Sequence, residues 1–325
     1  MMNDSQNGIV YYKKSKNIGD DIQTYAAWQL VENAVFCDRE QLHQYQTPTK
    51  LLCNGWFMNN GANWPPASHI DSLFISFHIS SSCQNEMTRP ASIAYFQQYQ
   101  PVGCRDIHTQ QLLEKHKVSS YLSGCLTLTL PHYKGDRNDE ILFVDVMRKN
   151  YTSSYRSAIV NKLIPKTYKN QVQHLTHFSN DLKDKSIEQR MNDVENLLKR
   201  YKKAKVVFTS LIHCALPCIA MGTPVVFIDA GFNNNAAKRD RFGGILDLFP
   251  NVVDVSLPFG KRTLLHRLMR VSGLYLLSLK KLKPLDEKLF RLIPNQSNPQ
   301  KIAKKNEGIH TILFFKYLVM LSVVI

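Results

Sequence analysis

The chain has 325 residues, of which 44% are hydrophobic and 21% are charged. This length suits two domains rather than one small core, and the composition excludes a chain that is disordered throughout. Lys and Arg number 41 against 26 Asp and Glu, a net charge of +15. Such an excess favours an anionic partner, which is a phosphorylated substrate, nucleic acid or an anionic membrane surface.

The first half of the chain alternates short apolar runs with amphipathic segments. Strands are predicted at 8–12, 34–37, 51–53, 72–80, 102–104 and 121–130, and helices at 21–32, 93–99 and 108–117. Asp20 precedes the first helix and is its expected N-cap.

The second half repeats this rhythm after a polar, turn-rich linker at 131–140. Strands are predicted at 141–146, 172–178, 205–209, 223–228 and 252–255, and helices at 186–203, 211–221 and 240–249. We therefore expect an N-terminal Rossmann-like domain over 1–133, a second over 134–260, and a basic helical tail with an apolar C-terminus over 261–325.

Strands that are apolar on both faces and alternate with helices predict an α/β fold with mainly parallel sheets. We expect the two domains to face each other across a cleft. In open α/β sheets, ligands bind outside the carboxyl ends of the strands. The strand-to-helix turns are therefore where function is expected.

Three such turns carry chemistry. Asn17, Gly19 and Asp20 open the first helix, and they either cap it or bind a hydroxyl of a sugar. Arg105 follows a strand and can pair with a carboxylate or phosphate, or instead form a surface pair with Asp106 that caps the next helix. His213 lies in the first turn of an apolar helix, where it either donates a proton or is a core histidine.

Fainter signals surround these turns. His78 ends a strand and is expected to face the same cleft. Trp56 and Trp64 bracket a loop rich in Gly and Asn, and they either stack on a sugar ring or pack in the core. A basic turn with Lys238, Arg239 and Arg241 can meet an anion or remain solvated.

The seven cysteines are scattered and include no CxxC pair. Their odd number and placement indicate reduced thiols in a reducing compartment, without a disulfide framework or a zinc site. Cys214 and Cys218 lie one helical turn apart, and we interpret both as small packing residues.

Three stretches together resemble the polysaccharide pyruvyl transferase family. They are NIGDDIQTYAA at 17–27, GCRDIHTQQLLEKHKV with SGCLTLTL at 103–130, and VVFTSLIHCALPCIAMGTPVVFID at 206–229. A weaker match, NGWF…WPP…LFISFHI, lies at 54–79. The resemblance covers roughly residues 8–260 and is carried by the three stretches jointly, because none suffices singly.

The resemblance implies a fold similar to the two-domain GT-B type with a central cleft. It also implies transfer of a pyruvyl group from phosphoenolpyruvate to two hydroxyls of a sugar, with no metal or other cofactor. By position, Arg105, Ser210 and His213 would bind the donor, and His213 would be the catalytic acid. Arg241 is a further candidate for the donor, because it, Lys238 or Arg239 could substitute for a missing arginine. Asn17, Gly19, Asp20 and His78 would line the cleft on the acceptor side.

One departure from the family pattern bears on the donor. The family has Ser-Arg-Leu-His where this chain has Ser210-Leu211-Ile212-His213, so that Leu211 replaces an expected arginine. Losing one bidentate partner weakens binding of a dianion in a dry site by roughly 2–5 kcal/mol. Two alternatives therefore stay open, a glycosyltransferase that uses a nucleotide sugar and an inactive relative that binds sugars or anions. Nucleic-acid binding finds no motif in support.

The end of the chain is basic and then apolar. Twelve Lys and Arg face only Asp286 and Glu287 over 261–305, and 309–325 is almost continuously apolar. A polar N-terminus predicts no secretory signal, so we expect a cytoplasmic protein. The basic segment is either a solvated face or suited to peripheral association with the anionic inner face of a membrane. For the apolar end, a peripheral tail, a weak anchor and a shifted reading frame stay open.

Overall fold

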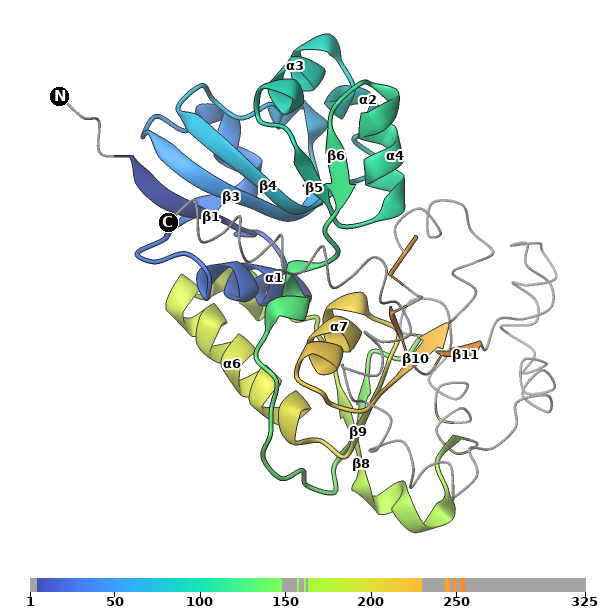
Figure 1. The fold of residues 1–325 in the computed structure, drawn as a ribbon. Helices are drawn as coiled ribbons and strands as arrows, with labels where there is room; N and C mark the ends of the chain where they lie inside the picture. The colour runs from blue at the N-terminus through green and yellow to red at the C-terminus, as the bar shows by residue number, and fades with distance from the viewer. Residues whose placement is uncertain are drawn as a thin grey trace.

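The computed structural model describes residues 5–147, 157, 161, 163–229, 243–245, 248, 249 and 252–254. The described residues form two parallel β-sheets with helices packed against them (Figure 1). The predicted α/β class and the parallel, Rossmann-like sheets are confirmed. The cleft between the two units and the domain boundaries at 133 and 260 stay predictions.

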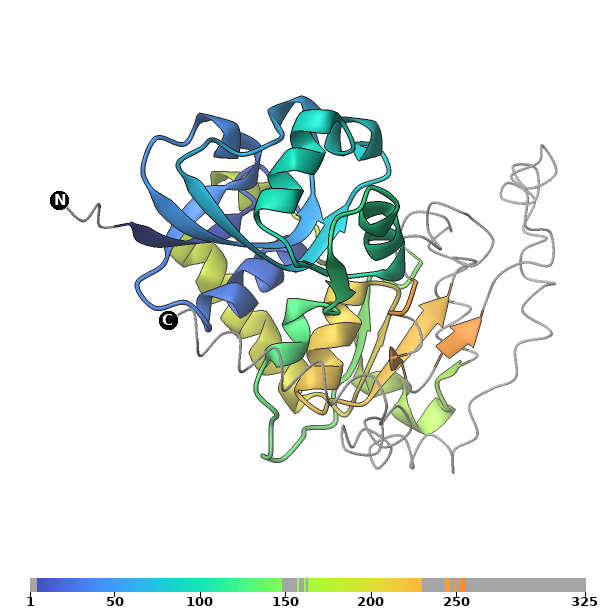
Figure 2. The same cartoon turned by 45° about the horizontal axis from the view of Figure 1, so that its top comes forward.

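The first sheet has six strands in the order β2-β1-β3-β4-β5-β6. Helix α1 covers one of its faces, and α2, α3 and α4 lie over the other (Figures 1 and 2). The strands are β1 (Gln6–Tyr11), β2 (Val35–Asp38), β3 (Thr49–Phe57), β4 (Ile70–Ile79), β5 (Val102–Cys104) and β6 (Ser120–Leu122), and the helices are α1 (Ile18–Trp28), α2 (Gln84–Met87), α3 (Pro90–Gln98) and α4 (Ile107–Lys115).

The second sheet has five strands in the order β11-β10-β9-β7-β8. Its described helices, α6 and α7, lie on the side where α1 of the first unit packs (Figure 1). The strands are β7 (Ile141–Val144), β8 (Val172–Leu175), β9 (Val206–Thr209), β10 (Val225–Asp229) and β11 (Val252–Asp254), and the helices are α6 (Ile187–Lys203) and α7 (Ile212–Ala220).

A single apolar cluster joins the two sheets. It contains Leu52 and Ile75 of the first sheet, Val207 and Phe227 of the second, and Ile22 of α1 between them. A second cluster fills the opposite face of the first sheet and is rich in aromatic rings, including Trp64, which packs on Phe96 at 5.1 Å between ring centroids. Trp64 is therefore a core residue, and the alternative that it stacks on a sugar is wrong.

A buried ion pair ties the two units together. Arg190 of α6 is fully buried and donates to both carboxylate oxygens of Asp21 in α1, at 3.0 and 2.9 Å. The same guanidinium donates to the carbonyls of Tyr12, Lys13 and Ser15, which form the turn between β1 and α1. Arg190 therefore fixes a loop of the first unit from a helix of the second.

Two predictions about local structure are wrong. The predicted strand at 121–130 ends at Leu122, and Leu126–Thr129 forms a 3-10 helix that packs against α7. Asn17, and not Asp20, is the N-cap of α1, because the Asn17 Oδ1 atom accepts from the Gly19 amide at 3.0 Å. An asparagine at this position satisfies an amide that the helix leaves open.

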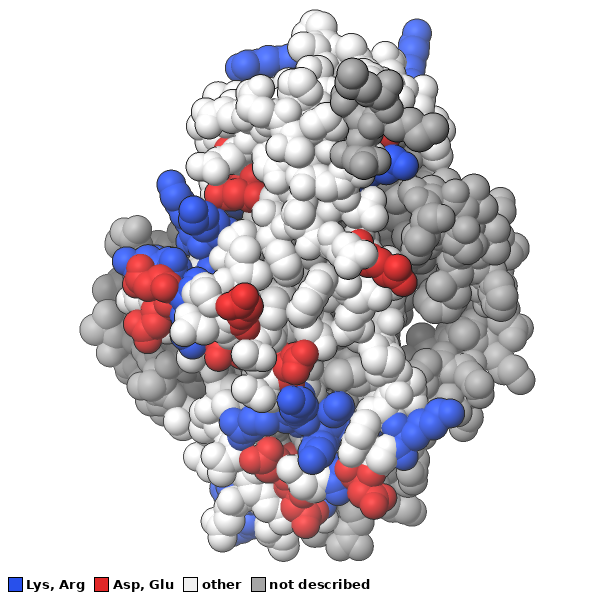
Figure 3. Space-filling view, turned by 90° about the vertical axis from the view of Figure 1, so that its left-hand side faces the viewer, with Lys and Arg blue, Asp and Glu red and all other residues white. Residues whose placement is uncertain are grey.

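The surface around α6 carries both signs of charge. Figure 3 shows Lys and Arg interleaved with Asp and Glu on this face, without one continuous basic patch. Ion pairs such as Lys199–Glu195 and Lys185–Asp193 account for part of this pattern. In the part of the chain that the structure describes, every helix is too short or too polar to cross a membrane. The basic segment 261–305 and the apolar run 309–325 lie outside the described residues.

Candidate functional site

In both sheets, the order in which the chain adds its strands reverses at one strand, and ligands bind near such a point in open α/β sheets. The chain adds β2 on one side of β1 and β3 on the other, and in the second sheet it adds β8 and β9 on opposite sides of β7. Loops leaving such neighbouring strands diverge and leave a crevice outside their carboxyl ends. The turns after β1 and β3, and after β7 and β9, are therefore the expected places for a site.

Three polar or aromatic side chains lie on neighbouring strands at the carboxyl end of the first sheet. Trp56 of β3 pairs in register with His78 of β4, and Arg105 directly follows β5. His78 Nδ1 contacts Asp106 and Thr109 at the start of α4, and the Trp56 ring contacts the Arg39 guanidinium.

Arg105 is a buried cation whose hydrogen-bonding capacity is unmet. Its side chain is fully buried, and its Nε, Nη1 and Nη2 atoms have no hydrogen-bond partner among the described residues. The closest carboxylate oxygen is Asp106 Oδ2, 3.7 Å from Nε. Burying a guanidinium without acceptors is costly. Arg105 thus has the properties of a residue that binds an anionic ligand.

Asp106 belongs to this arrangement as well. Its Oδ1 atom accepts from the Thr109 amide at 2.9 Å and so caps α4, while Oδ2 lies 2.5 Å from His78 Nδ1. Burial by itself would raise the pKa of Asp106, but His78, Arg105 and the Thr109 amide outweigh burial and lower it below the usual 3.8. The alternative of a surface Arg105–Asp106 pair is wrong, because both residues are buried, although Asp106 does cap the helix.

His213 meets the first unit at the start of α1. It lies in the first turn of α7 and is 4% exposed. A Cβ atom placed on Gly19 would lie 3.2 Å from His213 Cβ and 3.1 Å from His177 Nδ1. Gly19, His177 and His213 are therefore neighbours, and a larger residue at position 19 would press on the His177 ring and on the His213 Cβ atom.

His177 was not selected from the sequence. It follows β8, and its Nε2 atom lies 2.6 Å from the Tyr201 hydroxyl. Burial favours a neutral Cys214 thiol, but hydrogen bonds from Cys218, His177 and Tyr201 together with the His177 charge lower the pKa of Cys214 to about 6. Cys214 and Cys218 are buried in the core as predicted, but Cys214 has polar neighbours that its apolar sequence context does not reveal.

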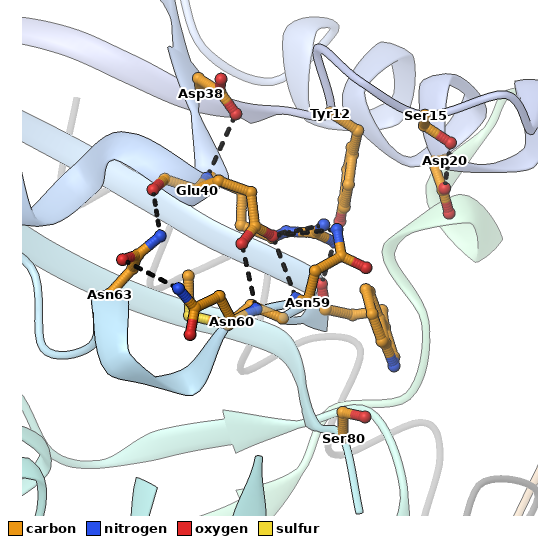
Figure 4. Close-up of polar contacts among 12 residues, drawn as sticks. Tyr12, Ser15, Asp20, Asp38, Glu40, Asn59, Asn60, Asn63 and Ser80 are labelled. Carbon is orange, nitrogen blue, oxygen red and sulfur yellow. Dashed lines mark hydrogen bonds and ion pairs between the residues drawn. The ribbon is translucent and has the colours of Figure 1, made fainter. Parts of the chain in front are cut away.

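The first three amides of α1 are engaged by other atoms of the described chain. The Ile18 amide donates to the His177 carbonyl at 2.9 Å, and the Gly19 and Asp20 amides donate to Asn17. The Asp20 carboxylate accepts from the Ser15 hydroxyl at 2.6 Å, and Figure 4 shows both side chains at the same end of the first sheet as Tyr12 and Ser80. Asn17 and Gly19 thus shape this turn, and their role toward a sugar stays a prediction.

The Ser210 hydroxyl is engaged within the second unit. It donates to the Ile228 carbonyl at 2.8 Å and accepts from the Met147 amide at 3.2 Å, so it links β9 and β10 to the segment after β7. Leu211 occupies the N-cap position of α7 and packs against the cluster between the sheets. Arg241 lies outside the described residues, as do Lys238 and Arg239.

Trp56 is held in place by a stacked cation. The Arg39 guanidinium carbon lies 4.7 Å from the ring centroids of both Trp56 and Tyr12. Its Nε atom donates to Glu40, whose carboxylate also accepts from the amides of Asn59 and Asn60 (Figure 4). This network fixes the loop that follows β3, and it leaves Trp56 half-buried.

The predicted residues fall into two groups of neighbours. His213 lies beside Gly19 at the start of α1, next to Asn17 and Asp20. His78 and Arg105 both lie beside Asp106, at the start of α4. Among the described residues, no group of three or more His, Cys, Asp or Glu is placed to hold a metal ion.

Comparisons with known proteins agree with the sequence motifs. No curated protein matches the chain. A crystal structure of a functionally uncharacterised protein from Klebsiella pneumoniae is similar over 78% of this chain and 93% of that one, with 12% identity and a TM-score of 0.45. The sequence profile of the polysaccharide pyruvyl transferases matches residues 17–230, which include Asn17, Arg105 and His213. The chain belongs to the polysaccharide pyruvyl transferase family.

Proposed function

We propose that this protein transfers a pyruvyl group from phosphoenolpyruvate to two hydroxyls of a sugar in a polysaccharide or glycan precursor. The observation that carries the proposal is the buried Arg105 guanidinium, whose donors have no acceptor in the described chain. A carboxylate or phosphate of the donor would supply acceptors in the bidentate geometry that arginine prefers. Family membership supplies the reaction class.

His213 is the proposed acid. Protonation of the donor's methylene carbon would turn it into a methyl group and leave the adjacent carbon electrophilic. One sugar hydroxyl attacks this carbon and returns its proton to the imidazole. The second hydroxyl displaces phosphate, which leaves with that hydroxyl's proton, and a ketal remains. Positioned acids of this kind contribute about 10²- to 10⁴-fold in rate.

Leu211 supports a second candidate function. An apolar side chain stands where the family has an arginine, and it packs against the core rather than offering a donor. A protein that binds sugars or anions without catalysis would be compatible with this replacement. Binding and turnover therefore have to be measured separately.

The test is ligand-induced stabilisation followed by turnover. We expect phosphoenolpyruvate to raise the melting temperature and a panel of nucleotide sugars to leave it unchanged, because binding to the native state alone stabilises it. With candidate glycan precursors, we expect release of phosphate, and we expect His213→Ala to slow release by about 10²- to 10⁴-fold and to weaken donor binding much less. Stabilisation by a nucleotide sugar and not by phosphoenolpyruvate would contradict the proposal.

A further inference from the structure

We propose that Gln23 and Asn54 form a subsite that recognises hydroxyl groups of the acceptor sugar. The identification of the ligand as the acceptor rests on the proposed function. The subsite itself rests on two buried oxygen atoms, Gln23 Oε1 and Asn54 Oδ1, which have no hydrogen-bond donor among the described residues. Gln23 is 1% exposed and Asn54 is fully buried.

The orientation of both amide groups is set by their nitrogen atoms. Asn54 Nδ2 donates to the Gln23 carbonyl at 3.1 Å, and Gln23 Nε2 lies 3.4 Å from Asp20 Oδ1. A carbonyl and a carboxylate oxygen can only accept, so each amide must turn its nitrogen toward them. The two amide oxygens are thereby presented as fixed acceptors.

An irregularity in the sheet creates this arrangement. The pairing of β3 with β4 shifts between Cys53 and Gly55, where Asn54 lies opposite the segment before Phe77. In that segment, Ser76 has a φ of +61°, and its buried hydroxyl also has no partner in the described chain. Bulges of this kind occur beside active sites, where they redirect side chains.

Gly55 allows the polar groups to approach one another. It has a φ of +85°, and a Cβ atom there would lie 2.0 Å from the Tyr12 hydroxyl and 2.7 Å from Gln23 Oε1. Burial raises the pKa of Tyr12, so its hydroxyl keeps its proton, which it donates to the Asn54 carbonyl at 3.1 Å. Tyr12 therefore does not satisfy Gln23 Oε1, although it is close to it.

The two amide oxygens without a hydrogen-bond donor indicate which chemical groups the ligand carries. Fixed oxygen acceptors require a ligand with O–H or N–H donors, whereas Arg105 requires an anion. Ionised phosphoenolpyruvate has acceptor oxygens but no hydroxyl group to donate. Under the proposed function, hydroxyl groups of the acceptor sugar supply these donors. Trp56 follows Asn54 by two residues on β3, and its ring is half-buried against Arg39.

The experiment compares Gln23→Met with Gln46→Met, a matched control at an exposed glutamine. Binding of a panel of methyl hexosides is measured by saturation-transfer NMR on the full chain. We expect Gln23→Met to weaken glycoside binding about fivefold to tenfold, which corresponds to one neutral hydrogen bond, and the control to bind as the wild type does. The melting temperature of Gln23→Met should be unchanged or higher, because the substitution removes a buried acceptor that has no donor.

Asn54→Leu, measured in the same way, keeps the proposal testable if Gln23→Met fails to fold. Wild-type glycoside binding by the folded variant, or a wild-type protein that binds no member of the panel, would overturn the proposal. If glycoside binding falls in Gln23→Met while phosphoenolpyruvate neither binds nor releases phosphate, the subsite stands and the proposed transfer reaction fails. The two claims are thus separable.

Discussion

Arg105 combines complete burial with unmet hydrogen bonds. A salt bridge inside a protein stabilises only when its geometry compensates for desolvation, and the 3.7 Å separation from Asp106 is too long for a hydrogen bond. The interaction of Arg105 with Asp106 therefore compensates for little of the desolvation free energy that burial of the guanidinium costs. Such a residue is retained when a ligand uses it.

Replacing Arg105 with leucine should separate binding from stability. We expect the binding free energy of phosphoenolpyruvate to weaken by about 2–5 kcal/mol, because the substitution removes one charged partner of the anion. We expect a melting temperature close to that of the wild type, because removing a buried guanidinium without hydrogen-bond acceptors offsets the loss of its interaction with Asp106. Calorimetric titration and thermal unfolding measure the two effects, with the exposed Arg89→Leu as control. A destabilised Arg105→Leu variant with normal donor affinity would show that the residue is structural.

The Asp106 carboxylate makes the free energy of unfolding depend on pH. Its folded pKa lies below 3.8, so its carboxylate stabilises the fold fully at neutral pH, and this contribution is lost as the pH falls below that value. Asp106→Asn keeps a residue that caps helices well and removes only the charge. We expect the difference in unfolding free energy between wild type and variant to shrink as the pH falls below 3.8. Urea unfolding across that range measures it, and a difference independent of pH would exclude the carboxylate as the cause.

The sequence shows where the candidate site residues lie relative to the strands, but it does not show which residues they contact. Arg105 and His213 follow strands, and that position is visible in the pattern of apolar runs. His177 could not be found in this way, because its role depends on Gly19 and Tyr201, which are remote in sequence. Asp20 was chosen as N-cap because it precedes the apolar helical positions, but Asn17 begins the helix one turn earlier.

At the scale of elements, α1 contacts both units of the molecule. Its face packs on the first sheet, and Arg190 of α6 binds Asp21 from the second unit. Burial raises the pKa of Asp21 to about 7, against the opposing charge of Arg190, so each partner is costly to bury without the other. This pair fixes the turn that precedes Asn17.

A double-mutant cycle should reveal the strength of this link. We expect Arg190→Met and Asp21→Leu each to destabilise by about 3–5 kcal/mol, because Asp21→Leu leaves the buried Arg190 charge unpaired and Arg190→Met leaves a buried carboxyl group without its donors. The double variant should lose much less than the sum, because no unpaired charge remains. The control is Lys185→Met at the partly exposed Lys185–Asp193 pair, where we expect about 0–1 kcal/mol. Additive losses in chemical unfolding would contradict a coupled pair.

Most elements were predictable, and the failures have a common cause. Parallel strands are apolar on both faces and are short, so β5 and β9 stand out clearly. The run after Leu122 is equally apolar, yet Gly124 adopts a φ of +70° and the chain turns into a 3-10 helix on α7. Apolar composition reports burial, and only the tertiary packing decides between a strand and a helix.

At the scale of the whole molecule, the two sheets share one apolar cluster and meet around α1. Arg105 comes from the first unit and follows β5, whereas His213 comes from the second unit and lies beside Gly19 of α1. Strand order could not be read from the sequence, and it fixes where the turns after β5 and β9 lie within their own sheets. A reaction at this junction would need both units.

A crystal structure of the complex with phosphoenolpyruvate tests the central claim most directly. We predict that a carboxylate or phosphate oxygen of the donor accepts hydrogen bonds from the Arg105 guanidinium. We also predict that the donor's methylene carbon lies within reach of the His213 imidazole. A donor bound elsewhere on the chain, with Arg105 still without an acceptor, would contradict the account.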